Sequence, residues 1–444
     1  MSNSPIRARG ATVFGAVLVL LATVLMLPAA TAAASTSAGT ASPGAGATFS
    51  LPWLSLSSSG WTTCGVRSDN SGWCWGYNYS GQIGDGTTHN ALAPRQLPGL
   101  WRTITNASYA TCGVRTDGTG WCWGSNYRGR LGDGTTTDRL SPTQVPGLWA
   151  SVLPGDTATT CGIRPDTTGW CWGANSSGGI GDGTEVDRLS PTQVPGSWVQ
   201  LATGEDTSCG VRTDASGWCW GSNFSGTVGD GTRIDRATPT QLAGTWKSVT
   251  IGRNFRACGI RTDDTGWCWG YNAYGQLGNG QTRNRHNPAQ LPGKWASLYP
   301  SGELMTCGIT VHGVGFCWGL NDHGQVGDGT LTMRTTPTRL PGVWSSLDPG
   351  LGQTTCGVRP DHSLWCWGRN AEGSVGIGTT THNVLTPQPV GFGWGVVTTR
   401  LVDAACGIKD TGTLWCWGLN DRGQLGDTTR EQRTRPVKVV APTP

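Results

Sequence analysis

The chain has 444 residues, of which 14% are charged, and a formal net charge of +4. This near-neutral balance argues against a nucleic-acid partner, because phosphate backbones are bound through clustered basic residues. The 70 glycines and 24 tryptophans, with 36% hydrophobic residues, are typical of short strands and tight turns and argue against long helices.

The N-terminal segment has the layout of a secretory signal. Arg7 and Arg9 precede an apolar run from Ala11 to Leu27, and small residues follow up to Ala34. We therefore expect residues 1–34 to be a signal peptide and the protein to be secreted and extracellular, with no membrane span in the mature chain. The alternative is an uncleaved anchor that tethers the protein to a membrane, since about 20 apolar residues span a bilayer.

A repeat fills residues 51–440, between a flexible low-complexity linker at 35–50 and a tail at 441–444. Each unit has a tryptophan followed, 11 or 12 residues later, by the first of two cysteines ten positions apart. The pairs are Cys64 and Cys74, Cys112 and Cys122, Cys161 and Cys171, Cys209 and Cys219, Cys258 and Cys268, Cys307 and Cys317, Cys356 and Cys366, and Cys406 and Cys416. First cysteines recur every 48 to 50 residues, a period that predicts a propeller or a solenoid of eight complete units.

The cysteines of each unit flank a predicted β-hairpin. A segment such as TCGVR is typical of a strand, TDGTG of a turn, and WCWG of the returning strand. Two cysteines placed symmetrically about the turn face each other across neighbouring strands, so each pair predicts a cross-strand disulfide. Closing a loop of about eleven residues contributes on the order of 3 kcal/mol per bridge.

Two other roles for the cysteines are less favoured. Zinc sites generally use tighter CxxC or histidine spacing, and the six histidines do not follow the repeat, so we predict no metal site. A catalytic thiol requires an unpaired cysteine near a histidine, and none is left over.

The segment after each hairpin carries a second motif, seen as WGSNYRGRLGDGT at 123–135 and WGYNAYGQLGNGQ at 269–281. It resembles the repeat of the regulator of chromosome condensation family, and the cysteine-bearing hairpin is similar to that of exported bacterial members. The resemblance implies an all-β fold, a β-propeller of four-stranded blades, usually seven. Eight complete units favour eight blades here, with a seven-bladed ring and one displaced repeat as the alternative. Ring closure is expected to pair residues 435–440 with the strand around Trp53.

The same resemblance suggests two kinds of activity. Nuclear members catalyse guanine-nucleotide exchange through a loop insertion and a basic tail, but the eight units here differ by at most three residues in length. An exported bacterial relative instead inhibits β-lactamase by using the fold as a binding surface. The export signal favours the second kind of role, without specifying its target.

The sequence shows no motif for catalysis or for a cofactor. It contains no Walker A loop, HExxH or nucleophile elbow, and we predict that the protein is not an enzyme and needs no cofactor. The recurrent aspartates of the GDGT loops (Asp85, Asp133, Asp182, Asp230 and Asp328) are interpreted as turn caps, with calcium binding left open. The arginine and aspartate around each hairpin turn are expected to hold that turn, and the WCW tryptophans to pack between blades.

Variable loop residues are the candidate site. The positions around the fixed asparagine after each WG differ from unit to unit and hold five of the seven tyrosines. A ring of such loops has the composition of a binding surface, so we predict partner-binding residues there. They are Tyr77, Tyr79, Tyr127, Arg128, Phe224, Tyr271, Tyr274, His323, Arg369 and Arg422. The alternative is that these aromatics only fill gaps between blades.

The segment after each GDGT is mildly basic. It carries arginines such as Arg139, Arg188, Arg236 and Arg285, against five acidic residues. A solvated charged rim is the favoured interpretation, and a surface for an acidic partner is the other.

Three functional hypotheses follow. The leading one is an exported, disulfide-stabilised, monomeric propeller that binds an unidentified protein through its loop face. The alternative is a lectin-like propeller that binds a cell-surface or extracellular glycan. The third is an enzyme with a site on the central channel, which a close pair of carboxylates on one face would support. One contiguous aromatic patch favours the first, and eight separate pockets favour the second.

Overall fold

The computed structural model describes residues 51–300 and 302–440. The predicted signal peptide (1–34), linker (35–50) and tail (441–444) lie outside these residues. Within them, no helix has the length and apolar character that a membrane crossing requires. Their helical structure consists of the short 3₁₀ turn η1 (Tyr127–Gly129).

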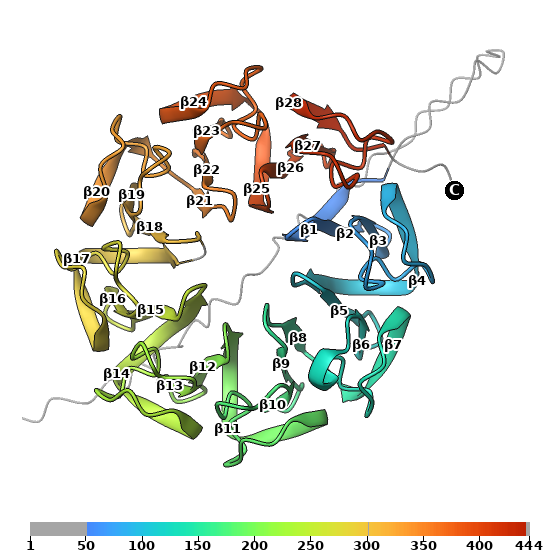
Figure 1. The fold of residues 1–444 in the computed structure, drawn as a ribbon, viewed down its shortest axis with the longest axis vertical. Helices are drawn as coiled ribbons and strands as arrows, with labels where there is room; N and C mark the ends of the chain where they lie inside the picture. Colours follow the sequence, from blue (N-terminus) through green and yellow to red (C-terminus); the bar gives the residue numbers. More distant parts are fainter. Residues whose placement is uncertain (1–50, 301, 441–444) are drawn as a thin grey trace, which may run out of the picture. The chain divides into compact units, whose positions relative to one another are not determined.

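The described residues form eight four-stranded antiparallel blades arranged in a ring, with the first strand of each blade innermost (Figure 1). Blade 1 consists of β1 (Trp53–Ser59), β2 (Thr62–Arg67), β3 (Ser71–Gly76) and the first part of β4 (Ala91–Asn106). Blade 2 consists of the rest of β4, β5 (Ala110–Arg115), β6 (Thr119–Gly124) and β7 (Arg139–Leu148). Blade 3 consists of β8 (Ser151–Pro154), β9 (Thr159–Ile163), β10 (Thr168–Gly173) and the first part of β11 (Arg188–Thr203). Blade 4 consists of the rest of β11, β12 (Thr207–Arg212), β13 (Ser216–Gly221) and the first part of β14 (Arg236–Gly252).

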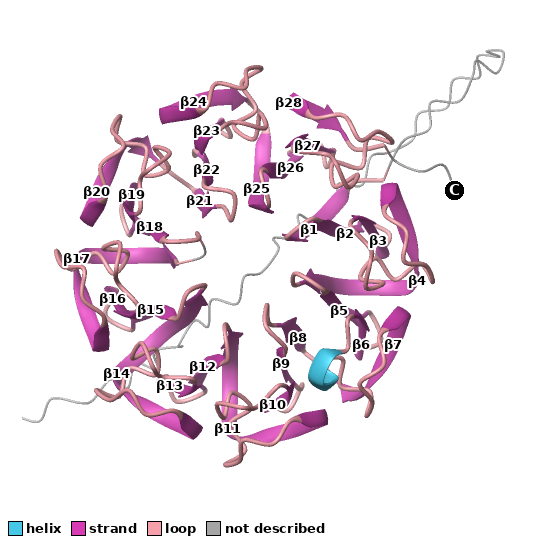
Figure 2. Cartoon of the chain, in the orientation of Figure 1, coloured by secondary structure: helices cyan, strands magenta, loops and turns pink. Residues whose placement is uncertain are grey.

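The second half of the ring repeats this order (Figure 2). Blade 5 consists of the rest of β14, β15 (Arg256–Arg261), β16 (Thr265–Gly270) and the first part of β17 (Arg285–Tyr299). Blade 6 consists of the rest of β17, β18 (Met305–Thr310), β19 (Val314–Gly319) and β20 (Arg334–Val343). Blade 7 consists of β21 (Ser346–Pro349), β22 (Thr354–Val358), β23 (Leu364–Arg369) and β24 (Asn383–Gly391). Blade 8 consists of β25 (Trp394–Leu401), β26 (Ala404–Lys409), β27 (Leu414–Gly418) and β28 (Arg433–Lys438).

These pairings confirm the all-β propeller and its eight blades, one for each sequence unit. The long strands β4, β11, β14 and β17 each serve two blades, because the chain bends between its pairing with one hairpin and its pairing with the next. In β4, residues 91–100 pair with β3 and residues 101–106 with β5.

The predicted closing strand pair is wrong. The C-terminal strand β28 pairs with β27 of its own blade, and β1 pairs only with β2 among the described strands. The ring closes through contacts between complete blades: the Trp53 amide donates to the Gly412 carbonyl (2.8 Å), and the Val402 amide donates to the Gly60 carbonyl (2.7 Å). Each unit supplies all four strands of its blade, so no strand is left to be exchanged between the chain ends.

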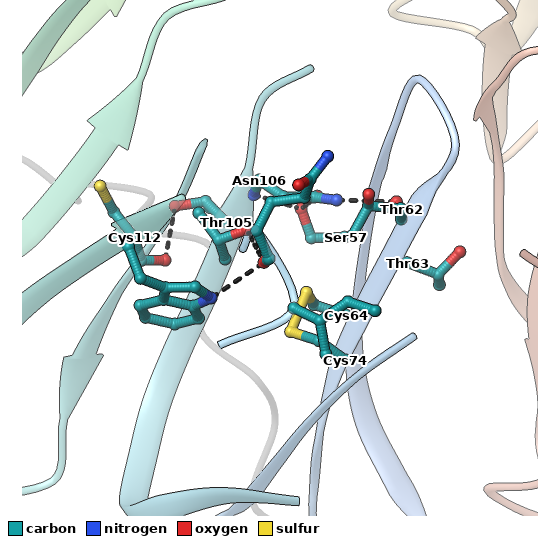
Figure 3. The surroundings of a disulfide bond; sticks show 12 residues. Ser57, Thr62, Thr63, Cys64, Cys74, Thr105, Asn106 and Cys112 are labelled. Atoms are coloured by element: carbon teal, nitrogen blue, oxygen red, sulfur yellow. Dashed lines mark hydrogen bonds between the residues drawn. A yellow bond between two sulfur atoms is a disulfide. The ribbon is translucent and has the colours of Figure 1, made fainter. Parts of the chain in front are cut away.

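All eight predicted disulfides are present, and every cysteine is paired. Each bridge joins directly opposed residues of the two middle strands, as Cys64 faces Cys74 across β2 and β3 with 4.1 Å between the Cα atoms. Figure 3 shows this bridge beside Ser57 and Asn106, whose side chains form a hydrogen bond of 2.6 Å between the inner strands of blades 1 and 2. Eight intrachain disulfides point to an oxidising compartment.

The second tryptophan of each WCW packs between blades, as predicted. Trp123 of blade 2 is fully buried, and its indole N–H donates to the Gln82 carbonyl of blade 1 (2.9 Å). Gly84 has a φ of +83°, and a Cβ there would lie 2.6 Å from the same indole nitrogen, so only glycine fits. Trp75 of blade 1 makes the equivalent bond to blade 8, which closes the ring with the contact that the other blades use.

In the hairpin turns, the structure confirms the predicted role of the aspartate but not that of the arginine. Asp117 holds its turn by accepting from the Thr119 amide (2.9 Å) and hydroxyl (2.7 Å). Arg115 instead stacks over the rings of Trp101 and Trp121, at 5.2 and 3.8 Å from their centroids. The basic residue therefore clamps two tryptophans rather than the turn itself.

Every outermost strand carries a proline, three residues after the position that Arg139 occupies in blade 2. These prolines are Pro94, Pro142, Pro191, Pro239, Pro288, Pro337, Pro387 and Pro436. The outermost strand pairs on one side only, and proline removes a hydrogen-bond donor from a strand edge that would otherwise invite pairing with another chain.

Candidate functional site

Two sets of loops meet at one end of each blade. The loops between the third and fourth strands contain the predicted site residues except Arg369, which is the last residue of β23. The turns between the first and second strands lie beside these loops. In blade 1 the Tyr77 amide donates to the Trp61 carbonyl (3.0 Å), and in blade 2 the Ser125 amide donates to the Tyr109 carbonyl (2.9 Å). We call this end of the ring the loop face.

A fixed asparagine gives each loop a rigid frame. Asn126 accepts from the Leu131 amide (3.0 Å), and its side-chain N–H groups donate to Asp133 and the Thr135 carbonyl (both 3.0 Å). The side chain of Asn126 is fully buried. The neighbouring positions are therefore free to vary without disturbing the loop, as Tyr127 shows by being 62% exposed.

An aromatic patch lies over blades 8, 1 and 2. The rings of Tyr77 and Tyr79 are 4.8 Å apart, and Trp61 lies 5.9 Å from Tyr77. The Arg422 guanidinium of blade 8 lies within 6 Å of both tyrosine rings, at 5.8 and 5.9 Å. Burial raises the pKa of Tyr77, and the neighbouring Tyr109 of blade 2 raises it further. We define the aromatic patch as Trp61, Tyr77, Tyr79, Tyr109 and Arg422.

Tyr127 and Arg128 continue this surface on blade 2. Arg128 lies over the Tyr127 ring at 5.8 Å and forms an ion pair with Asp187 (3.5 Å). Burial lowers the pKa of the nearby Arg130 guanidinium, and Tyr109 and Tyr127 are among the groups close enough to oppose that change. The Ser125 amide donates to the Tyr109 carbonyl (2.9 Å), so the loop that carries Tyr127 lies beside Tyr109 of the aromatic patch.

The remaining aromatics form a second, smaller group on blades 4 and 5. Phe224 packs edge-on against Phe255 with 4.3 Å between ring centroids. The Tyr271 amide donates to the Phe255 carbonyl, and the Tyr274 amide donates to Gln276 (both 2.9 Å). Tyr271 and Tyr274 are partly buried, unlike the exposed Phe224.

The last two predicted residues lie in a polar part of the face. His323 of blade 6 packs against His382 at 5.5 Å and shares a hydrogen bond with Asn383 (3.0 Å). Arg369 of blade 7 forms an ion pair with Asp403 of blade 8. The loop face is therefore asymmetric, with aromatic residues on one side and charged residues on another.

Sequence reasoning missed three aromatic residues of this face. Trp61, Tyr109 and Phe255 lie in the turns between the first and second strands, three residues before the first cysteine of their units. The residue three positions before the first cysteine varies between units, and only two units share the same residue there. Comparing the repeats at this position would have identified it as a second variable position of the face.

Charged groups gather at the mouth of the channel on the same face. Arg253 of blade 5 reaches Asp156 of blade 3 (3.0 Å) and Ser108 of blade 2 (3.2 Å). Burial raises the pKa of Glu205 on blade 4, Asp156 adds to the rise, and Arg253 opposes it. Asp156 and Glu205 both line one cavity on this face, which is the kind of carboxylate pair that would support the enzyme hypothesis. Arg253 is held by Asp156 and also stands near Glu205, which makes the group a charge network that ties blades 2, 3 and 5.

The aspartates of the GDGT loops act as turn caps in this structure. Asp133 accepts from the Thr135 amide (3.0 Å) and hydroxyl (2.8 Å), and its other oxygen accepts from Arg139 (2.6 Å). Burial alone would raise the pKa of Asp133, but these hydrogen bonds outweigh it and hold the pKa below its usual range. Across 51–300 and 302–440, no three histidine, cysteine or acidic side chains come together as metal ligands.

Fewer arginines of the basic rim are available to an acidic partner than the sequence suggested. Five of its arginines form ion pairs with the loop aspartates of their own blades: Arg139 with Asp133, Arg188 with Asp182, Arg236 with Asp230, Arg334 with Asp328 and Arg433 with Asp427. These pairs hold each loop to its outermost strand and leave less positive charge for a partner.

The sequence model described as "Regulator of chromosome condensation (RCC1) repeat" matches residues 69–116, 117–153, 263–297, 361–409 and 411–443. The chain therefore carries repeats of this family. A matched RCC1 segment such as 69–116 runs from the outer strands of one blade into the inner strands of the next, so the family unit and the blade are offset. No curated protein sequence matches the chain significantly.

Solved structures share the RCC1 fold at low identity. Human WBSCR16 is 20% identical, with 75% of this chain and 96% of that chain covered and a TM-score of 0.60. Prp20p from Saccharomyces cerevisiae, described with its binding to Gsp1p and histones, is 18% identical over 78% of this chain and 90% of its own, with a TM-score of 0.60. Yeast RCC1 (Prp20) bound to Kap60 is 18% identical over 79% and 87%, with a TM-score of 0.58. Propellers of this kind are typically binding or exchange-factor modules.

Proposed function

We propose that this protein is an exported, non-enzymatic, monomeric propeller that binds another protein through the aromatic side of its loop face. The observation that carries the proposal is the contiguity of the aromatic patch with Tyr127. Tyr79 and Tyr127 are 61% and 62% exposed, although both are large and partly apolar. Tyrosine, tryptophan and arginine are the residues that most often anchor protein interfaces.

The rigidity of the loops supports binding at this surface. Each loop is held by its buried asparagine, so little conformational entropy is lost when a partner docks. Eight disulfides fit a protein that works in an oxidising environment without assistance. The known partners of the yeast relative are not transferred to this chain, because at 18% identity only the fold is shared.

A paired-variant binding experiment tests the proposal. The immobilised wild-type protein, a Tyr79→Ser/Tyr127→Ser variant and a Phe392→Ser control are each exposed to proteins secreted by the producing cell. Phe392 is 69% exposed but lies between β24 and β25, away from the loop face, so it matches the aromatic loss without touching the patch. We expect one protein to be retained by the wild type and the control and to fall at least tenfold with the double variant.

Retention that is equal for all three proteins would overturn the proposal. A glycan array with the same three proteins separates the alternative. Glycan binding that disappears only in the Tyr79→Ser/Tyr127→Ser variant would favour a lectin-like propeller and contradict a protein partner.

A further inference from the structure

The outer rim carries one ion pair in each of five blades. In these blades the arginine at the start of the outermost strand bonds the loop aspartate at 2.5 to 2.7 Å, as Arg236 bonds Asp230 in blade 4. The aspartate side chain is at most 7% exposed, whereas the arginine is about one third exposed. The arginine is thus placed by the fold to receive a carboxylate.

Blade 5 keeps the arginine and lacks the carboxylate. Arg285 occupies the arginine position, pairing with Gly270 as Arg236 pairs with Gly221. Asn279 stands where the other blades have aspartate. Among the described residues, Arg285 forms no ion pair and no side-chain hydrogen bond.

The Asn279 amide has an unsatisfied donor. Its oxygen accepts from the Asn272 side chain (3.3 Å) and from the Gln281 amide (3.2 Å). Both neighbours are donors, which fixes the end of the amide that is oxygen. The Asn279 Nδ2 therefore points the other way, and it is buried without an acceptor in the described structure. Asn279 therefore supplies no acceptor of the kind that Asp230 supplies to Arg236 in blade 4.

A groove of about 750 Å³ opens at this point of the rim. Asn279, Asn284, Arg285 and His286 line it, with Thr336 of blade 6 at one side, and its described lining contains no acidic side chain. Blade 6 has a groove of about 490 Å³ at the equivalent position although its ion pair is complete. The groove itself is a feature of the repeat, and blade 5 is distinguished by an arginine at the rim position that lacks its aspartate.

We propose that this rim groove of blade 5 binds a carboxylate group. The carboxylate oxygens accept from the exposed Arg285 guanidinium, so the ligand supplies the charge that an aspartate supplies in the other blades. Planar, paired recognition of this kind is what arginine provides and lysine does not. The carboxylate belongs to a free small acid or to an acidic side chain of a peptide, and both present the same group.

Blade 1 has the opposite arrangement, with the aspartate present and the arginine absent. Asp85 is present there, but Ala91 stands where the other blades have arginine, and a groove of about 650 Å³ again opens beside it. This groove contains the Asp85 carboxylate as well as the Arg95 guanidinium, and Asp85 should repel a second carboxylate at the position that Asn279 occupies in blade 5. One bound carboxylate per chain is therefore expected.

Calorimetric titration of the full chain with succinate tests the site through three variants. Asn279→Asp restores the pattern of the other blades and gives Arg285 an internal partner, so succinate affinity should fall at least tenfold while the protein stays folded. Arg285→Ala should give a similar loss. Asp230→Asn converts blade 4 to the blade 5 pattern and should raise the stoichiometry from one to two.

Two results would overturn the proposal: no succinate binding to the wild type at tens of millimolar, or equal binding by the wild type and Asn279→Asp. A blocked Gly-Glu-Gly peptide and its glutamine form distinguish the sources of the carboxylate. Tighter binding of the glutamate peptide than of succinate, lost in Asn279→Asp, identifies an acidic side chain as the ligand. Succinate binding without peptide binding identifies a free acid.

Discussion

The two ends of each blade differ in what they allow to vary. At the hairpin end, a basic residue lies over the two tryptophans of its blade in seven of the eight blades: Arg67, Arg115, Arg164, Arg212, Arg261, Arg359 and Lys409. At the loop end, the exposed positions change from aromatic to acidic to aliphatic around the ring. Recurrence marks the contacts that hold the ring together, and variation marks the surface that is free to acquire a partner.

Blade 6 shows that the recurring contacts form a unit. It has Thr310 where the other blades have the basic residue, and Phe316 where they have the first tryptophan of WCW. The cation and its aromatic partner are absent from the same blade, while the second tryptophan, Trp318, remains. The stacked pair is therefore dispensable in one blade, whereas the buried tryptophan is kept in all eight.

The largest effect is expected from this buried tryptophan. Trp220 is fully buried and donates its indole N–H to the Gly179 carbonyl of the preceding blade (2.9 Å). Trp220→Ala removes a large core side chain and leaves that carbonyl without its donor, so we expect a loss of about 3–5 kcal/mol in the free energy of unfolding. Urea unfolding measures it, with Trp218→Phe as the control, because blade 6 carries phenylalanine at that position. A control as destabilised as Trp220→Ala would remove the distinction between the two tryptophans.

The disulfides come next in size. Replacing Cys209 and Cys219 of blade 4 together by serine removes one bridge that closes a short hairpin, and we expect a loss of about 3 kcal/mol. The same measurement after full reduction of the wild type should show a larger loss that is less than eight times as great, because the bridges lie in blades that share interfaces. A double serine variant as stable as the wild type would show that strand pairing alone holds the blade.

Much of the blade could be predicted from the sequence because its determinants are local. The two cysteines of a unit are ten residues apart on one hairpin, so their pairing follows from turn position and strand alternation. The blade number follows from the completeness of the eight units. Arg115 is near Asp117 in sequence, but it lies over Trp121 across the hairpin and over Trp101 of the preceding strand, which the turn motif alone does not reveal.

The site was only partly predictable, because its contacts join different units. Tyr79 and Arg422 are 343 positions apart and meet only because the ring closes. Tyr109 lies outside the variable loop after WG, in a neighbouring turn whose position on the same face only the folded ring reveals. The unpaired donors of Asn279 and Arg285 become visible only when the ion pair of the other blades is known in three dimensions.

A smaller effect is expected from the stacked arginine. Arg212 lies 3.9 Å from the Trp218 ring and 5.0 Å from the Trp198 ring, and it donates to the Pro195 carbonyl (2.9 Å). Arg212→Thr copies blade 6 and should cost about 1 kcal/mol of unfolding free energy. The reverse change, Thr310→Arg, should stabilise blade 6 only when combined with Phe316→Trp. Equal stabilisation by Thr310→Arg alone would separate the cation from its aromatic partner.

The smallest effect is expected from the rim ion pair, and pH reveals it. The pKa of Asp133 is lowered in the folded protein, so its contribution to stability is present above the unfolded pKa of about 3.9 and is lost as the pH falls toward the folded value. Asp133→Asn should therefore cost about 0.5 kcal/mol at pH 7, because Arg139 is one third exposed, and less at pH 2.5.

Asn279→Asp supplies the opposite change in blade 5. It should add a similar amount of stability at pH 7, through a new pair with Arg285, and the gain should disappear at pH 2.5 when the carboxyl is protonated. Urea midpoints of the wild type and the two variants at both pH values measure this. Opposite effects at pH 7 that converge in acid would show that the rim of blade 5 differs from the other rims by one missing carboxylate. A gain from Asn279→Asp that persists at pH 2.5 would mean that Arg285 does not face this position, and the contrast between blades 4 and 5 would then rest on packing instead of charge.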